Sequence, residues 1–375
     1  MNTWQEILAA SNSDILKWVE SREWCAPMQA CQQDPVWHAE GDVWTHTKMV
    51  LEELVAIDEF QDLPREQQLV LFLTAIFHDS GKPATTVVEE STGRIRSPKH
   101  AATGARIARK QLMDLGCPFE LREHICHLVL FHGRPPYLGS KGTPQHDVIR
   151  VSTYLSNRLL YLFALADTRG RICTSDDRKD PEEILEMWKL ESQESNCFDG
   201  PYKFMNDHAR FLYYRGQLDN FHYEPYEDYR CRMTLVCGLP GAGKDTWLQE
   251  NRGELPVVSL DAIRRQMKVE PGGNQGVVVQ QGKEQCRQYL RDRVDFALSA
   301  TNVARQIRQL WIDIGANYNA RIEIVYVEPA MQTIFEQNKS RDGIAVVPED
   351  VIKRLAGKLD PPTLAECHDL QLVTE

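Results

Sequence analysis

The sequence predicts a chain of two structural classes, an all-α N-terminal half and an α/β C-terminal half with a mostly parallel sheet. Apolar residues recur at helical spacing through the first half, with little strand signal. From residue 231 onward, short apolar strand candidates alternate with helical segments, which is typical of a three-layer α/β domain. A length of 375 residues allows two or three domains that each bury a core.

Composition excludes several classes of protein. No apolar run approaches the roughly 20 residues that a membrane helix needs, and residues 1–20 lack a basic segment followed by an apolar block. The ten cysteines form no CxxC pair, which indicates reduced thiols rather than a disulfide framework or a zinc ribbon. We therefore expect a cytoplasmic protein with no membrane partner. A net charge of −11 leaves room for a local basic groove.

The N-terminal half is expected to be a bundle of helices separated by glycine- and proline-containing breaks. The breaks fall at residues 81–83, 133–137 and 142–144. A charged helix over 176–193, an aromatic stretch and a polar stretch over 219–229 then predict a connection between domains. Predicted helices cover residues 42–57, 67–78, 101–115 and 148–158, and a further apolar stretch covers 161–167. The expected division is 1–175, a connecting segment 176–230, and 231–375.

The C-terminal half alternates strands with helices. The predicted strands are 233–237, 257–260 and 322–327, and a further strand-like stretch precedes residue 299. The predicted helices are 245–249, 281–293 and 302–314.

A glycine-rich loop, Gly-Leu-Pro-Gly-Ala-Gly-Lys-Asp-Thr at residues 238–246, joins the first strand to its helix. This context is that of a phosphate-cradling loop, in which Lys244 reaches the β- and γ-phosphates. We expect it to bind ATP with Mg²⁺; the alternative is an ordinary turn. Ser or Thr normally follows the lysine and binds Mg²⁺, whereas here Asp245 and Thr246 are both candidate ligands. The expected nucleotide-binding residues are Gly238, Gly241, Ala242, Gly243, Lys244, Asp245 and Thr246.

Charged residues after the second strand suggest a phosphoryl-transfer site. A carboxylate at the carboxyl end of a parallel strand faces the ligand crevice. There Asp261 could accept the proton of an attacking hydroxyl and Arg264 could clamp a phosphate. The alternative for Asp261 is a helix N-cap. Arg305 and Arg308 belong either to a binding groove or to a solvated helix face, and the basic run 338–341 is typical of a lid over a triphosphate.

These elements together resemble the polynucleotide 5′-kinase family over residues 231–375. The resemblance rests on the glycine loop, the strand-end Asp with Arg three positions on, Thr-Asn at 301–302, and the Arg-bearing lid before Val-Pro at 347–348. It implies transfer of the ATP γ-phosphate to a 5′-OH end of RNA or DNA. It also implies that Lys244 and Arg341 stabilise the transferring charge, Asp261 is the general base and Arg264 holds the acceptor strand. Ser299 stands where the family has its first Asp.

Histidine and aspartate residues in the N-terminal half suggest a metal site. His78 and Asp79 end an apolar helical run, His46 lies on an earlier helix and Asp167 ends a later one. Imidazole and carboxylate suit divalent transition metals, and His100 and His132 could hold a second ion. His38 is the less favoured alternative to His46, and His124 and His127 are expected to be packing or surface residues.

This pattern resembles the HD phosphohydrolase superfamily over residues 30–175. The string at 37–47, Trp-His-Ala-Glu-Gly-Asp-Val-Trp-Thr-His-Thr, is similar to HD domains found beside tRNA nucleotidyltransferases. The resemblance implies two ions such as Mn²⁺, Ni²⁺ or Co²⁺, held by His46, His78, Asp79, His100, His132 and Asp167. Lys82 and Arg171 are candidate phosphate clamps, or else solvated cations.

The order of the halves resembles bacterial fusions of an HD domain with a polynucleotide kinase. The resemblance implies removal of a 2′,3′-cyclic or terminal phosphate from one broken RNA or DNA end and phosphorylation of the other, with sealing by a separate ligase. Two alternatives stay open, a nucleotide or metabolite phosphohydrolase fused to a small-molecule kinase, and an ATP-binding sensor. The expected nucleic-acid groove gathers Arg264, Arg265, Lys268, Lys283, Arg287, Arg291, Arg305 and Arg308.

Overall fold

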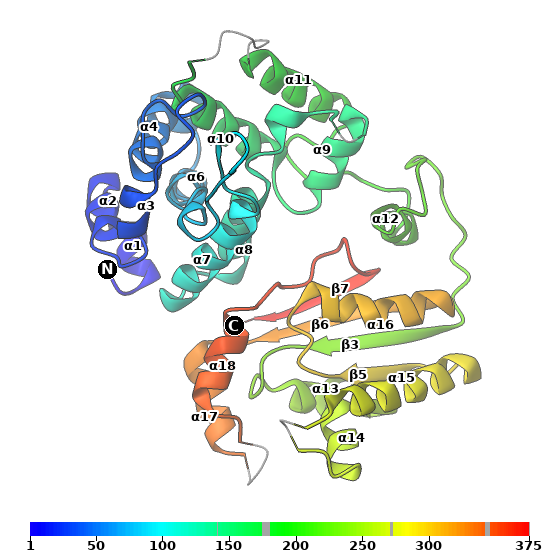
Figure 1. The fold of residues 1–375 in the computed structure, drawn as a ribbon. Coiled ribbons are helices and arrows are strands. Elements are labelled where there is room, and N and C mark those ends of the chain that lie inside the picture. Colours follow the sequence, from blue (N-terminus) through cyan, green and yellow to red (C-terminus); the bar gives the residue numbers. More distant parts are fainter. Residues whose placement is uncertain (141, 175–180, 271–272, 342–345, 375) are drawn as a thin grey trace. The chain divides into compact units, whose positions relative to one another are not determined.

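The chain forms two compact units, Met1–Tyr202 and Lys203–Glu375 (Figure 1). The computed structural model describes residues 1–140, 142–174, 181–270, 273–341 and 346–374. The division between the units falls between Tyr202 and Lys203, inside the segment 176–230 that the sequence predicts as a connection. The predicted boundary at 175/176 lies outside the described residues.

In its described residues, the first unit consists mainly of helices and contains one short antiparallel hairpin, β1 (Val87–Val88) with β2 (Ile95–Arg96). Two short 3₁₀ turns, Lys82–Ala84 and Pro135–Tyr137, interrupt it. Its α-helices are α1 (Trp4–Ala9), α2 (Asn12–Glu20), α3 (Ala26–Ala30), α4 (Val43–Ala56), α5 (Asp58–Gln61), α6 (Arg65–Phe77), α7 (His100–Asp114), α8 (Phe119–Phe131), α9 (Pro144–Ser152), α10 (Asn157–Arg169) and α11 (Pro181–Glu194).

Helices α6 and α10 form the centre of this unit. Every residue of α6 from Leu69 to Phe77 is buried, and so is the apolar run of α10 from Leu159 to Ala166. A helix that is apolar on all sides must be covered on all sides, and α4 and α8 pack against this pair. The core therefore gathers around the helix ends that carry the predicted metal ligands.

The single helix predicted over 148–158 is wrong. Helix α9 ends at Ser152, and α10 begins at Asn157 after a turn. The Ser156 hydroxyl accepts a hydrogen bond from the Leu159 N–H, which starts the new helix as an N-cap. The buried Asn157 amide donates to the main-chain oxygens of Val148 and Cys197, so tertiary contacts fix the break.

The second unit is a five-stranded parallel sheet with strand order β4-β5-β3-β6-β7. Its strands are β3 (Cys231–Cys237), β4 (Val257–Ser259), β5 (Phe296–Ser299), β6 (Ala320–Glu328) and β7 (Asp369–Thr374). Its helices are α12 (Asp207–Tyr214), α13 (Lys244–Arg252), α14 (Leu260–Gln266), α15 (Gln275–Asp292), α16 (Arg305–Asn317), α17 (Met331–Lys339) and α18 (Glu349–Ala356).

The parallel sheet confirms the predicted α/β class and places the loops after β3, β4 and β5 at one edge. Strand β3 pairs with β5 and β6, and its residues from Met233 to Cys237 are all buried, as in parallel strands that are covered on both faces. The edge strand β7 was not predicted, because its half-exposed polar and apolar residues give a weak signal. Among the described helices, none has the length and hydropathy needed to cross a bilayer.

A buried ion-pair cluster gives the helical unit a testable acid sensitivity. Glu123 accepts from Arg109 at 2.7 Å and from Arg122 at 2.8 Å. Burial by itself would raise the pKa of Glu123, but the two guanidinium groups outweigh it and lower the pKa from 4.5 to about 2. A lowered pKa in the folded state means that this contribution is complete above about pH 4.5 and is lost as the pH falls toward 2.

We expect Glu123→Gln to lower the free energy of unfolding at pH 7 by about 3 kcal/mol, because it leaves buried charges without a counterion. It should also flatten the pH dependence of stability between pH 4.5 and 2. Urea unfolding followed by circular dichroism at several pH values measures both effects. The exposed Glu120→Gln on the same helix is the control, and equal stability of the two variants would contradict the role assigned to the cluster.

Candidate metal centre and nucleotide site

Six predicted metal ligands of the helical unit meet at a buried centre. They come from helix ends and one helix interior that are far apart in sequence. The ligands are His46 in α4, His78 and Asp79 directly after α6, His100 at the start of α7, His132 directly after α8, and Asp167 in the last turn of α10.

Local features bring α4 and α10 together. The Asp42 carboxylate caps α4 by accepting from the N–H groups of Trp44 and Thr45, both at 2.9 Å. At the end of α10, a Cβ on Gly170 would lie 2.7 Å from the Val50 nitrogen of α4. Only glycine permits this approach, and it places Asp167 beside His46.

The first group of ligands comprises His46, His78 and Asp167, whose donor atoms lie within 4.8 Å of one another. The Asp167 Oδ1 atom is 3.0 Å from His46 Nε2 and 3.9 Å from His78 Nε2. One carboxylate oxygen thus faces two imidazole nitrogens from different helices.

The second group comprises Asp79, His100 and His132, also within 4.8 Å. Asp79 Oδ1 lies 3.5 Å from His100 Nε2 and 3.9 Å from His132 Nε2, and the two imidazole Nε2 atoms are 3.3 Å apart. The other oxygen, Oδ2, lies 3.2 Å from His78 Nε2. Asp79 therefore faces both groups and has the position of a bridging carboxylate.

The tautomers of the four histidines follow from their outer hydrogen bonds. Each Nδ1 lies against a main-chain carbonyl, which can only accept, so each Nδ1 carries a proton and Nε2 is the ring atom left to bind a metal ion. The acceptor carbonyls are Gly170 for His46 (3.1 Å), Ala75 for His78 (2.8 Å), Ser97 for His100 (2.8 Å) and Val129 for His132 (2.8 Å).

Ionisation at the centre favours a bound cation. Burial alone would raise the pKa values of Asp79 and Asp167, but Lys82 and His78 beside Asp79, and Arg171 and His46 beside Asp167, hold both pKa values well below the ordinary range. Both carboxylates are therefore charged. Burial, with smaller effects from neighbouring histidines, lowers the pKa of His132 to about 3, which keeps this imidazole neutral as a metal requires.

Two buried atoms at the centre test whether a metal fits. Within the described part of the chain, His78 Nε2 and Asp79 Oδ1 have no hydrogen-bond partner. Buried polar atoms are rarely left so, and lone pairs that face one another are stabilised by a cation between them. The donor set of imidazole nitrogen and carboxylate oxygen also matches divalent transition metals. The residues therefore fit two ions, one for each group.

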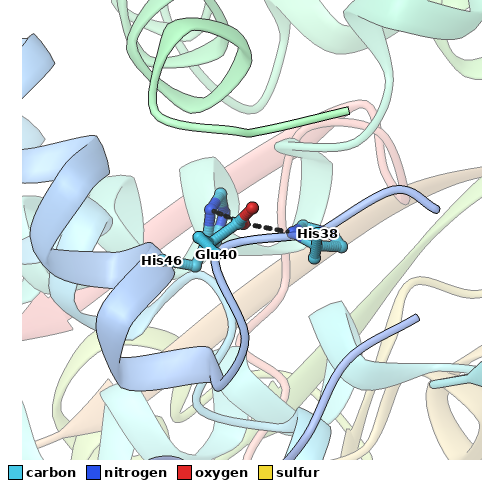
Figure 2. Close-up of side chains that lie close together, drawn as sticks. All are labelled: His38, Glu40 and His46. Atoms are coloured by element: carbon cyan, nitrogen blue, oxygen red, sulfur yellow. Dashed lines mark hydrogen bonds and ion pairs between the residues drawn. The ribbon is translucent and has the colours of Figure 1, made fainter. Parts of the chain in front are cut away.

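Glu40 is a residue of this site that the sequence analysis missed. Its Oε1 atom lies 2.7 Å from His38 Nδ1 and 3.0 Å from His46 Nδ1 (Figure 2), and its Oε2 atom accepts from the Ile172 N–H at 3.0 Å. Since His46 uses Nδ1 toward Glu40 and Gly170, this trio orients His46 and is not a third ion site. The sequence signal was an acidic residue six positions before the ligand histidine.

The two candidate phosphate clamps lie beside the ligand carboxylates. Lys82 Nζ is 2.7 Å from Asp79 Oδ2 and donates to Gln33 at 2.6 Å, and Arg171 donates to both oxygens of Asp167 at 3.1 and 3.0 Å. Neither is a solvated cation, because each is paired with a metal-ligand candidate. His124 and His127 lie elsewhere, where His127 Nδ1 donates to the Tyr154 carbonyl.

In the second unit, the glycine loop follows β3 and opens α13 as predicted. Gly241 has φ = 82°, and a Cβ there would lie 2.7 Å from the Ile334 carbonyl and 3.0 Å from the Asn338 Cβ atom of α17. Glycine therefore lets the loop pack against the helix that begins the predicted lid. Lys244 Nζ donates to the carbonyls of Gly238 and Leu239 at 3.0 and 2.9 Å.

Charged groups of the predicted kinase site lie near Lys244. Burial lowers the pKa of Lys244, the carboxylates of Asp245 and Asp261 oppose this, and Arg341 reinforces it. The Asn338 side chain exchanges two hydrogen bonds with the main chain of Val347 and so joins the two ends of the predicted lid. Residues 342–345 between them lie outside the described residues.

The alternative of Asp261 as a helix cap is wrong. Helix α14 is capped by Ser259, whose hydroxyl accepts from the Ala262 N–H at 3.3 Å. Asp261 is exposed and forms an ion pair with Arg264, which also donates to Gln275 at 2.9 Å. Asp261 and Arg264 are thus adjacent at the carboxyl end of β4, and neither is needed to start the helix.

Arg308 does not belong to a groove or to a solvated face. It is fully buried and pairs with both oxygens of Glu366 at 2.8 and 2.9 Å. Its neighbours Arg287 and Arg291 in the expected groove both pair with Glu284. The basic surface is therefore smaller than the sequence predicted, because Glu366 from a distant segment and Glu284 on the same helix pair with part of it.

Comparisons with known families agree with the two-unit structure. Residues 43–155 match the model of the HD domain, and residues 233–362 match the model of an AAA domain. Together with the five-stranded parallel sheet, these matches show a helical HD domain followed by a C-terminal α/β domain of the AAA type that carries the glycine loop.

Individual relatives are similar over parts of the chain. A stretch of 89 residues is 39% identical to the CC-adding tRNA nucleotidyltransferase of Thermus thermophilus. It covers 24% of this chain and 19% of that protein, so the chain spans about a fifth of the curated relative's length.

Two solved structures are distantly similar. One is a protein of Chloroflexus aurantiacus J-10-fl whose kinase assignment is provisional, with 14% identity over 39% of this chain and 86% of that chain and a TM-score of 0.34. The other is a sugar kinase from Janibacter sp. HTCC2649, with 15% identity over 38% of this chain and 85% of that chain and a TM-score of 0.29. Similarity this distant carries no information about substrate.

The bridging position of Asp79 predicts how metal content responds to substitution. Asp79→Asn removes charge from both groups and should abolish most metal binding, whereas His100→Asn should remove only the ion of the second group. Metal per chain after dialysis against Mn²⁺, measured by plasma mass spectrometry, distinguishes the two. The control is Asp114→Asn, whose carboxylate is exposed. Equal metal content in Asp79→Asn and the control would contradict the site.

The contact between Glu40 and His46 predicts that a substitution of Glu40 weakens metal binding less than Asp79→Asn does. Glu40→Gln keeps the shape of the side chain but removes the charge that orients His46, and metal affinity should fall by about 10- to 100-fold. A competition titration with a chelating dye measures this. The exposed Glu90→Gln should retain the wild-type affinity, and an unchanged affinity in Glu40→Gln would show that Glu40 has no orienting role.

Proposed function

We propose that this protein is a bifunctional enzyme that heals broken RNA or DNA ends. Its HD domain removes a 2′,3′-cyclic or terminal 2′- or 3′-phosphate, and its P-loop domain phosphorylates a 5′-OH end with ATP. The observation that carries the proposal is that one chain combines a buried His and Asp centre with a glycine loop and with the Asp261–Arg264 pair, which follows β4 at the same edge of the sheet. A separate ligase would seal the healed ends.

In the HD domain, His46, His78 and Asp167 would hold one ion, and His100 and His132 the other, with Asp79 between them. Bound ions supply a polarised phosphoryl oxygen and a water of lowered pKa. Lys82 and Arg171 stand at the carboxylates of the centre and supply positive charge for an incoming phosphate. Glu40 keeps the Nε2 lone pair of His46 directed inward.

In the P-loop domain, the chain's own residues account for the transfer. Lys244 neutralises charge on the β- and γ-phosphates, and Arg341 adds positive charge near it. Asp261 accepts the proton of the attacking 5′-OH as its oxygen bonds to the γ-phosphorus and the bond to the ADP oxygen breaks. Arg264, adjacent to Asp261, holds a phosphate of the acceptor strand.

Preference for a polynucleotide over a mononucleoside separates this proposal from a metabolite kinase. Supporting it, Arg265 and Lys268 are exposed next to the Asp261–Arg264 pair and can contact a phosphate backbone. An ATP-binding sensor would bind nucleotide without turnover, whereas the exposed Asp261 and its arginine partner are suited to proton and phosphoryl transfer.

An oligonucleotide with a 5′-OH and a 2′,3′-cyclic phosphate tests both activities together. We expect Lys244→Ala to lower the rate of 5′ labelling from ATP by about 100-fold or more and to leave 3′ phosphate release intact. Asp79→Ala should lower the rate of 3′ phosphate release by a similar factor and leave 5′ labelling intact. The reactions are followed by gel electrophoresis of labelled RNA and DNA with Mg²⁺ and with Mn²⁺ or Ni²⁺ or Co²⁺ present. Faster phosphorylation of mononucleosides than of oligonucleotides would contradict the proposal, as would loss of both activities in either folded variant.

A further inference from the structure

The residue after the loop lysine has an unexpected partner. The Ser299 hydroxyl, at the carboxyl end of β5, donates to Asp245 Oδ1 at 2.9 Å. Ser299 pairs in register with Val236 of β3, just before the glycine loop, so the end of β5 lies beside the start of α13. Asp245 is exposed, whereas Ser299 is buried.

This pair contains the two groups of an ordinary nucleotide-metal site in exchanged positions. In P-loop enzymes a Ser or Thr follows the lysine, and an Asp stands at the end of a neighbouring strand, and together they hold Mg²⁺. Here the carboxylate follows the lysine and the hydroxyl stands at the strand end. The hydrogen bond shows that the two side chains still meet.

We propose that Asp245 and Ser299 form the divalent-cation site of the bound nucleotide in this reversed arrangement. Asp245 is the anionic oxygen ligand, and Ser299 holds its carboxylate in position. This inference rests on the proposed binding of ATP at the glycine loop. The site takes a hard cation such as Mg²⁺, which prefers carboxylate, hydroxyl, water and phosphate oxygens.

Electrostatics supports a cation at Asp245. A carboxylate at the entrance of a triphosphate site repels the nucleotide unless positive charge lies between them. The positive charge of Lys244 offsets part of this repulsion, but the same charge also has to neutralise the β- and γ-phosphates. A divalent ion on Asp245 would attract both the carboxylate and the phosphates. The affinity for the nucleotide should therefore depend on Mg²⁺.

Thr246 is the competing ligand, and geometry distinguishes it from Asp245. Successive residues of a helix point about 100° apart, so Thr246 cannot occupy the direction in which Asp245 meets Ser299. The two assignments make opposite predictions. If Thr246 were the ligand, Thr246→Ala would lose the Mg²⁺ dependence of binding and Asp245→Asn would keep it.

The test measures the dissociation constant of a fluorescent ATP analogue in Mg²⁺ and in EDTA, using the full chain. Wild type should bind more tightly in Mg²⁺ by about tenfold, equivalent to about 1.4 kcal/mol. Asp245→Asn should bring this ratio close to one. Mn²⁺ bound in the ternary complex, detected by electron paramagnetic resonance, should be lost in parallel. Glu250→Gln, which removes an exposed charge from the same helix, is the matched control.

Exchanging the two residues tests whether the cation site can be rebuilt, in addition to whether a single substitution removes it. Ser299→Asp alone places two carboxylates against each other and should weaken nucleotide binding in EDTA. Combining it with Asp245→Ser recreates the ordinary arrangement and should restore most of the Mg²⁺ dependence. Circular dichroism melts establish that each variant is folded.

The outcomes separate this inference from the proposed function. An unchanged Mg²⁺ ratio in Asp245→Asn, a wild type that binds equally in EDTA, or a double variant no better than the single ones would overturn the inference. Mg²⁺-dependent binding that is lost in Asp245→Asn, with no phosphorylation of any 5′-OH end, would support the inference and defeat the proposed function.

Discussion

The structure of the helical unit depends on the orientation of four imidazoles whose Nε2 atoms gather around two buried carboxylates. Buried carboxylates are costly in a low-dielectric interior unless positive charge compensates them. Lys82 and Arg171 supply part of that charge at the edge of the centre. His78 Nε2 and Asp79 Oδ1 are buried without a hydrogen-bond partner in the described structure. A bound metal ion would satisfy both atoms, and for this reason the centre suits metal binding.

Three of the four imidazoles are fixed by local structure. His78, His100 and His132 each donate Nδ1–H to the carbonyl three residues earlier. Their orientation therefore needs only a helix end or a turn at the right place. His46 differs, because its outer partners are Gly170 and Glu40, and the former lies on another part of the chain. The long-range step of assembly is thus the docking of α4 against the end of α10, which Gly170 permits.

The sheet unit assembles its site by a different principle. Parallel strands in the order β4-β5-β3 bring three carboxyl ends to one edge, which collects Asp261, Ser299 and the glycine loop without any need for helix docking. Buried ion pairs such as Arg308–Glu366 then remove basic residues from the surface. Net charge and basic spacing along a helix do not reveal this, because the acidic partner can be dozens of residues away.

The two fold classes and the glycine loop with its lysine could be predicted from the sequence alone, and so could the six candidate ligand residues that the structure brings together, because periodicity and residue chemistry are local. It did not determine where α9 ends and α10 begins, that Ser259 rather than Asp261 caps α14, or that Arg308 is buried. The break between α9 and α10 and the burial of Arg308 depend on distant partners, Cys197 and Glu366. The contact of Glu40 with His46 and that of Ser299 with Asp245 became visible only in the folded chain, because a single contact through the turn before α4 or between two distant segments leaves no periodic trace in the sequence.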